Sequence, residues 1–150
     1  MADTPESAVA ATTREWVDRV HSLLGLHATE GNSIEVLRNG DEIFAAMVDA
    51  INNAERTVDI VTFVFWTGHV ADQFARALAG AANRGCRVRV LIDALAERKL
   101  DDGLVSVMKG AGCDLRWFRP FTDEKIPQLN GANNRTHRKI LVIDGNTGFI

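Results

Sequence analysis

From residue 33 onward, short apolar runs alternate with segments in which apolar residues recur every three or four positions. The first pattern is typical of strands and the second of amphipathic helices. The run at 57–66 is so rich in apolar and β-branched residues that it indicates a central strand covered on both faces. Strands are expected near residues 33–37, 57–66, 86–93, 114–118 and 137–143, and helices near residues 41–54, 70–84 and 100–109.

This alternation predicts an α/β fold with a mainly parallel or mixed β-sheet that is flanked by helices on both faces. Residues 1–31 are expected to form an N-terminal helical extension, and residues 32–150 the domain itself. The mixed charges of the extension favour packing on its own domain over a membrane surface or a partner. Residues 119–134 read as a long loop, which we expect to border a functional site.

Composition places the chain among ordinary soluble domains. It has 150 residues, of which 46% are hydrophobic and 25% are charged. The sequence has neither an apolar stretch that could span a bilayer nor a basic and apolar leader, so we expect a cytoplasmic chain. Cys86 and Cys113 lie 27 positions apart, which favours buried reduced thiols over a metal site.

The net charge of −3 conceals an uneven distribution. Residues 1–60 carry eleven acidic and four basic side chains, whereas residues 115–150 carry six basic and three acidic ones. The overall balance does not favour a general DNA-binding domain. A basic cluster late in the chain could still favour a phosphate-bearing substrate.

The informative segment follows the predicted loop. Arg135, His137 and Lys139 alternate along a predicted strand and should project from the same face. An isolated His-x-Lys would be read as ordinary surface residues. Here the pair is extended to His-x-Lys-x4-Asp by Asp144, in a strand late in an α/β unit.

With this motif the sequence resembles the phospholipase D superfamily, whose HKD motif is His-x-Lys-x4-Asp. Asn134-Arg135 and the apolar run 140–143 resemble the bacterial cardiolipin synthase branch. Further resemblance to the amino-terminal half of those enzymes covers about residues 32–150. It is carried upstream by residues 37–40, 51–54, 62–65, 81–85 and 90–93.

Two departures from the family accompany this resemblance. The family's motif is followed by a glycine pair, and complete enzymes have a second HKD motif in a second, similar half. The present sequence ends at Ile150, before the position of the glycine pair, and contains one motif. We therefore expect a fragment or excised domain, truncated just after the motif and with little activity alone.

The chemistry of the motif suits a phosphodiester. Lys139 and Arg135 are candidates for neutralising the phosphate oxygens, and neutral histidine is an abundant nucleophile near pH 7. The resemblance implies a phosphohistidine on His137, with no metal and no cofactor. It also implies a second histidine, from another half of the parent chain or from a partner chain, as acid and base.

Three classes of function remain open. The leading hypothesis is phosphatidyl transfer between phospholipid alcohols, as in cardiolipin synthases, acting peripherally at the inner face of the cell membrane without a transmembrane segment. The alternative enzyme is a phosphodiesterase or nuclease that acts on nucleic acid as a dimer. The third is an inactive scaffold, against which the intact His137 and Lys139 argue.

The residues around the motif differ in their expected roles. Seven positions of extended chain between His137 and Asp144 span roughly 23 Å, so Asp144 cannot orient the histidine of its own motif. We expect Asp144, the residue before Gly145, to bond turn amides and fix the hairpin that supports the strand, although the resemblance places it among the catalytic residues. Asp93, at the end of a predicted buried strand, is read as a turn or cap residue rather than a ligand-binding one.

Overall fold

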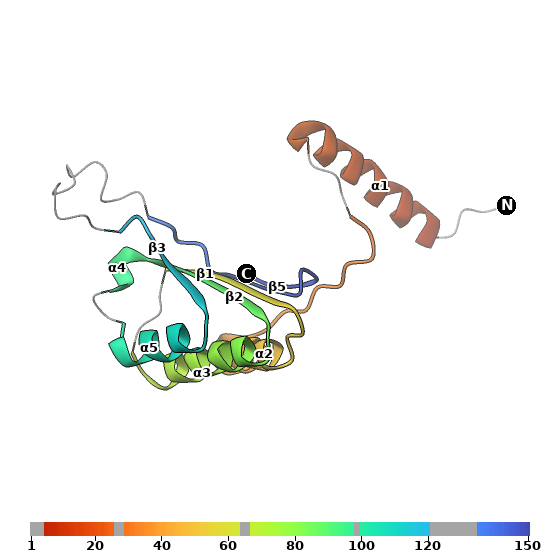
Figure 1. Ribbon diagram of the computed structural model, residues 1–150. Helices are drawn as coiled ribbons and strands as arrows, with labels where there is room; N and C mark the ends of the chain where they lie inside the picture. Colours follow the sequence, from red (N-terminus) through yellow and green to blue (C-terminus); the bar gives the residue numbers. More distant parts are fainter. Residues whose placement is uncertain (1–4, 26–28, 64–66, 98–99, 121–134) are drawn as a thin grey trace, which may run out of the picture. The chain divides into compact units, whose positions relative to one another are not determined.

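The structure, a computed structural model, describes residues 5–25, 29–63, 67–97, 100–120 and 135–150. It divides into two units, residues 1–36 and 37–150. The first unit contains α1 (Pro5–Leu24), in agreement with the predicted N-terminal helix (Figure 1). The division falls five positions after the boundary expected from the sequence.

The predicted strand at 33–37 is wrong. These residues have no regular secondary structure, and Ile34 and Val36 are exposed. Their alternation with polar residues imitates a strand. A strand is stable only when a neighbour accepts its hydrogen bonds, and no described strand pairs with this segment.

The second unit is an α/β fold with a five-stranded mixed sheet, as predicted. Its elements in chain order are α2 (Asn39–Asn52), β1 (Thr57–Thr62), α3 (His69–Asn83), β2 (Arg87–Asp93), α4 (Ala94–Glu97), α5 (Asp102–Gly110), β3 (Asp114–Phe118), β4 (Ile140–Ile143) and β5 (Thr147–Phe149). The strand order is β3-β2-β1-β4-β5. β1, β2 and β3 are parallel, and β4 is antiparallel to both β1 and β5.

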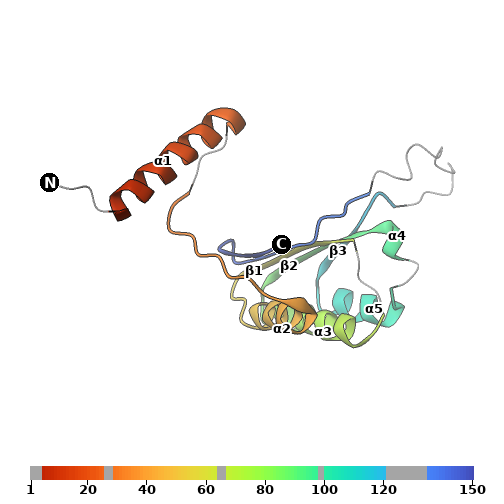
Figure 2. The ribbon, with the colours of Figure 1, turned by 180° about the vertical axis from the view of Figure 1, so that it is seen from behind.

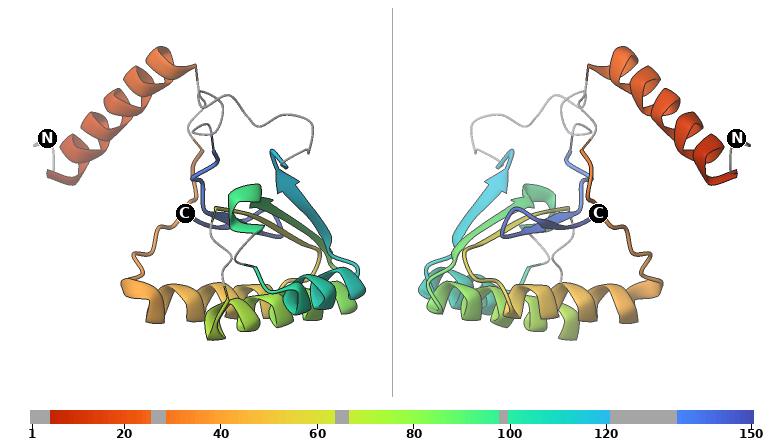
Figure 3. Two further views of the ribbon diagram at one scale, coloured as in Figure 1. Left: turned by 90° about the vertical axis from the view of Figure 1, so that its left-hand side faces the viewer. Right: turned by 90° about the vertical axis from the view of Figure 1, so that its right-hand side faces the viewer.

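The sequence predicts helices on both faces of the sheet, whereas α2, α3 and α5 cover the same face (Figures 1 and 3). The crossovers from β1 to β2 and from β2 to β3 run in the same direction across the sheet. Because such crossovers have a constant hand, they place α3 and α5 on one side. Small residues allow α3 to pack closely, and Ala75, Leu78 and Ala81 are completely buried there.

The other face of β1 differs from the expected strand covered on both sides. Val58 and Ile60 are buried against the helices, whereas Thr57, Asp59 and Val61, which alternate with them, are half-buried. Asp59 pairs in register with Arg89 of β2 and forms an ion pair with it. This face of the central strand carries the polar side chains of Thr57 and Asp59 beside Val61, so it does not form a second core within the described residues.

The cysteines confirm the prediction of buried reduced thiols. Cys86 and Cys113 are free and buried. The Cys86 thiol donates a hydrogen bond to the carbonyl oxygen of Ala54 at 3.2 Å, and burial raises the pKa of the Cys113 thiol. Both side chains belong to the core between the sheet and the helices.

Candidate active site at the carboxyl ends of the strands

The candidate site lies at the edge where the three parallel strands end. β4 runs antiparallel to β1, with Ile140 opposite Val61, so the chain that enters β4 is at the carboxyl end of β1 (Figure 2). β1 is also where the strand order reverses, because β2 lies on one side of it and β4 on the other. Such switch points are the usual ligand-binding positions of open α/β sheets.

The motif itself begins before the strand. A strand over 137–143 is predicted, but β4 starts at Ile140, and residues 135–139 have no regular secondary structure. The side chains of Arg135, His137 and Lys139 also differ in solvent exposure. His137 and Lys139 are exposed, whereas the Arg135 side chain is only 6% exposed. Without ladder hydrogen bonds the alternation of a strand is not enforced.

His137 is exposed, and its imidazole contacts the ring of Phe63 in a tilted arrangement. The two ring centroids are 4.6 Å apart, and the ring planes are inclined by 60°. Phe63 comes directly after β1, so the central strand provides the surface on which the imidazole rests. Sequence reasoning missed this contact. The available signal was the position of Phe63 at the end of the most apolar strand.

Lys139 lies close to the main chain of His137. Its ammonium donates a hydrogen bond to the carbonyl oxygen of His137 at 3.0 Å. The ammonium is therefore held at the main chain of His137, while both side chains remain exposed. This arrangement can receive an anionic group and stabilise negative charge that develops on it.

Arg135 is directed toward Asp93, the last residue of β2. Its Nη1 lies 3.5 Å from Asp93 Oδ1, and the Asp93 side chain is completely buried. The same Asp93 oxygen accepts a hydrogen bond from the Leu95 amide at 3.0 Å, which confirms the predicted turn role. Arg135 Nη1 also donates to the carbonyl oxygen of Arg119, just after β3, at 3.2 Å.

Asp144 lies at the opposite end of β4 from His137. Its carboxylate accepts hydrogen bonds from the main-chain amides of Glu55, Arg56 and Thr57 at 3.0, 2.8 and 2.8 Å. The bonds from the Glu55 and Thr57 amides hold the pKa of this carboxyl below its ordinary value. The expected contacts are with the amides of the hairpin turn that contains Asp144 and Gly145. The carboxylate instead binds the amides that lead into β1.

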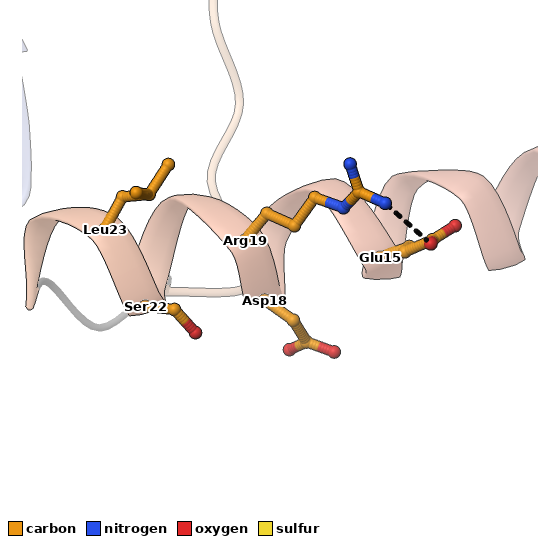
Figure 4. A pocket seen from close by; sticks show the side chains of 5 residues that line it. All are labelled: Glu15, Asp18, Arg19, Ser22 and Leu23. Carbon is orange, nitrogen blue, oxygen red and sulfur yellow. Dashed lines mark hydrogen bonds and ion pairs between the residues drawn. The ribbon is translucent and has the colours of Figure 1, made fainter.

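Two other features add nothing to this site. The predicted loop at 119–134 falls mostly outside the described residues, as does Asn134. A shallow hollow on α1 is lined by side chains of that helix alone (Figure 4). Its lining consists of Glu15, Asp18, Arg19, Ser22 and Leu23. Among the described residues, no helix is long and apolar enough to cross a membrane.

Comparison with known proteins agrees with this geometry. The family model described as "Cardiolipin synthase, PLD-like domain" matches residues 47–150, more than half of the chain. The chain belongs to this family of the phospholipase D superfamily. The match includes Phe63, Asp93 and the whole His-x-Lys-x4-Asp motif.

Curated relatives of this phospholipase D-like chain are longer bacterial proteins. Cardiolipin synthase B of Shigella flexneri is 35% identical over 125 residues, which cover 81% of the chain and 29% of that protein. Cardiolipin synthase of Geobacillus kaustophilus is 34% identical over 116 residues, or 77% of the chain and 22% of that protein. The chain thus spans less than a third of the length of these relatives.

Proposed function

We propose that this phospholipase D-like chain provides the first catalytic motif of an enzyme that transfers phosphatidyl groups between phospholipid alcohols. The observation that carries this proposal is the exposed His137 imidazole at the switch point of the sheet, in contact with Phe63, with the Lys139 ammonium bonded to the carbonyl oxygen of the same histidine. The cardiolipin synthase relatives indicate the substrate class. The site would act on phospholipid at a membrane surface, on the inner face of the cell membrane.

In the proposed first step, a ring nitrogen of His137 attacks the phosphorus atom of a phosphatidyl donor. The nitrogen–phosphorus bond forms as the bond from phosphorus to the donor alcohol breaks, and the alcohol leaves with a proton from a second histidine. In the second step that histidine takes the proton of the acceptor alcohol. The alcohol oxygen then attacks phosphorus and releases His137.

The chain's own residues divide this work. Lys139 contacts the non-bridging phosphate oxygens, whose negative charge it offsets throughout the exchange. The expectation that Arg135 also binds phosphate would require its guanidinium to leave Asp93, so we place that contact on Lys139. The second histidine would come from another motif in a longer parent chain or from a partner chain.

A trapping experiment tests the proposal. The complete protein is incubated with phosphatidylglycerol vesicles, and the reaction is quenched without acid to preserve phosphohistidine. The modified peptide is then identified by mass spectrometry. We expect cardiolipin and glycerol as products and a phosphatidyl adduct on the peptide that contains His137. His137→Asn should lose both, whereas His21→Asn, which alters an exposed histidine of α1, should retain both.

A parallel incubation with single-stranded DNA separates the alternative enzyme class. Cleavage of DNA together with unchanged phosphatidylglycerol would replace the proposal by a nucleic-acid phosphodiesterase. Turnover of phosphatidylglycerol without a His137 adduct, and unaffected by His137→Asn, would refute the proposed nucleophile.

A further inference from the structure

A buried carboxylate contacts the residues that immediately precede the exposed His137. Asp93, at the end of β2, has no exposed surface, although an isolated buried carboxylate is strongly unfavourable. Such a group persists when cations and amide donors surround it. The donors around Asp93 therefore identify which parts of the chain this carboxylate holds in place.

Two of those donors belong to the residues that immediately precede His137. The Thr136 amide donates a hydrogen bond to Asp93 Oδ2 at 3.1 Å, and Arg135 Nη1 forms an ion pair with Asp93 Oδ1 at 3.5 Å. Arg135 extends the contact to the carbonyl oxygen of Arg119. One carboxylate thus ties the start of the motif segment to the ends of β2 and β3.

This attachment has a consequence for the histidine, because residues 135–139 make no strand ladder. Downstream, the segment is fixed from Ile140, where β4 pairs with β1. Upstream, the Asp93 contacts hold Thr136, the residue directly before His137. His137 is therefore fixed from both sides while its side chain remains exposed. An unattached extended segment would instead sample many backbone conformations.

We propose that Asp93 and Arg135 form a positioning pair that sets the placement of the His137 imidazole on Phe63. Neither residue touches the reacting atoms; each acts through the main chain of Thr136. The catalytic importance of this pair rests on the proposed function, but the placement of the ring does not. The experiment therefore reads out the ring directly in the 150-residue chain.

Nuclear magnetic resonance measures that placement. The imidazole proton signals of His137, assigned with His137→Asn, carry a ring-current shift from Phe63 that Phe63→Leu removes. Spectra are recorded at one pH that keeps the imidazole neutral. In Asp93→Asn and Arg135→Met we expect the His137 signals to move most of the way to their positions in Phe63→Leu. Arg135→Lys, which retains a cation, should restore a substantial part of the shift.

Matched controls come from an exposed pair of the same chemistry. Asp72 and Arg76 form an ion pair on α3, so Asp72→Asn and Arg76→Met should leave the His137 signals in place. If the Asp93 or Arg135 variants melt cooperatively and keep the wild-type His137 signals, the positioning role is wrong. If the variants change the His137 signals as expected but no phosphatidyl adduct forms on His137 in the trapping experiment, only the proposed function is refuted.

Two further measurements test the proposal even if a single Asp93 or Arg135 variant fails to fold. Asp93→Asn combined with Arg135→Gln removes both charges and leaves no buried charge unpaired. The unmodified chain supplies an independent measurement, because the Thr136 amide should exchange with solvent at least about tenfold more slowly than an unprotected amide. A Thr136 amide that exchanges at the unprotected rate would overturn the proposal without any variant.

Discussion

The Asp144 carboxylate accepts a hydrogen bond of 2.8 Å from the amide of Thr57, which lies 87 positions earlier in the chain. In return, the Asp144 amide donates to the Thr57 carbonyl oxygen at 2.9 Å. Asp144 has a positive φ of 53°, a conformation that aspartate tolerates better than most residues. The last residue of the motif thus joins the end of β4 to the start of β1, away from His137.

Asp144→Ala should lower the melting temperature because it leaves the amides of Glu55, Arg56 and Thr57 without their acceptor. The loss should be on the order of 5 °C or more in a circular dichroism melt. Asp18→Ala, at an exposed position of α1, is the matched control and should melt like the parent. An Asp144→Ala protein that is as stable as the parent but inactive would place the carboxylate in the chemistry.

The same contacts predict a pH dependence. The folded-state pKa of Asp144 lies below the ordinary value of 3.8, because the Glu55 and Thr57 amides favour the charged form. The resulting stabilisation is complete above the unfolded pKa and is lost as the pH falls through the folded one. The difference in melting temperature between the parent and Asp144→Asn should be constant from pH 6 to 5 and shrink below pH 4. A difference that grows below pH 4 would contradict this.

The sequence predicts those helices and strands whose signal lies within their own residues. The spacing of apolar residues predicts β1, β2, β3 and the helices α2, α3 and α5 with ends within a few residues of those observed. The exception is β1, which ends earlier than the predicted strand. The segment at 33–37 had the right alternation but no partner strand, and pairing is not encoded in one strand's own residues. The placement of α3 and α5 on one face follows from the constant hand of the crossovers and from their direction, and the direction depends on the strand order.

The site could be predicted in part for the same reason. The spacing of His137, Lys139 and Asp144 is a property of one segment, and the exposure of the first two agrees with their expected access to substrate. The burial of Arg135 depends on Asp93, which lies 42 positions away in the sequence. Phe63 and Thr57 are likewise brought in by strand pairing. Tertiary contacts of this kind decide which basic residue faces solvent.

His137→Asn should abolish turnover in an active form of the protein while leaving the melting temperature within about 1 °C of the parent. The side chain is exposed, so its removal costs little packing, whereas loss of a covalent nucleophile typically costs about 10⁴-fold or more in rate. Initial rates on phosphatidylglycerol and thermal melts check both parts. Substantial residual turnover would exclude a phosphohistidine at this position.

The 150-residue chain by itself should show little or no turnover of phosphatidylglycerol. It contains one His-x-Lys-x4-Asp motif, whereas the proposed mechanism needs a second histidine to protonate the departing alcohol. Vesicle assays of the purified chain across a range of concentrations measure this. Activity that rises with the square of the chain concentration would show instead that two copies complete the site.

Lys139 and Arg138 offer a matched pair of adjacent, exposed cations with different expected roles. Lys139 holds its ammonium 3.0 Å from the His137 carbonyl oxygen. Removing a group that stabilises charge in the transition state typically lowers turnover by about 10²–10³-fold. We therefore expect Lys139→Gln to lower kcat on that scale without changing the melting temperature. Arg138→Gln should leave kcat within about twofold of the parent, because its neighbour already provides the phosphate contact. Equal losses in the two variants would mean that the basic segment attracts an anionic surface by net charge alone, and that Lys139 has no specific place in the reaction.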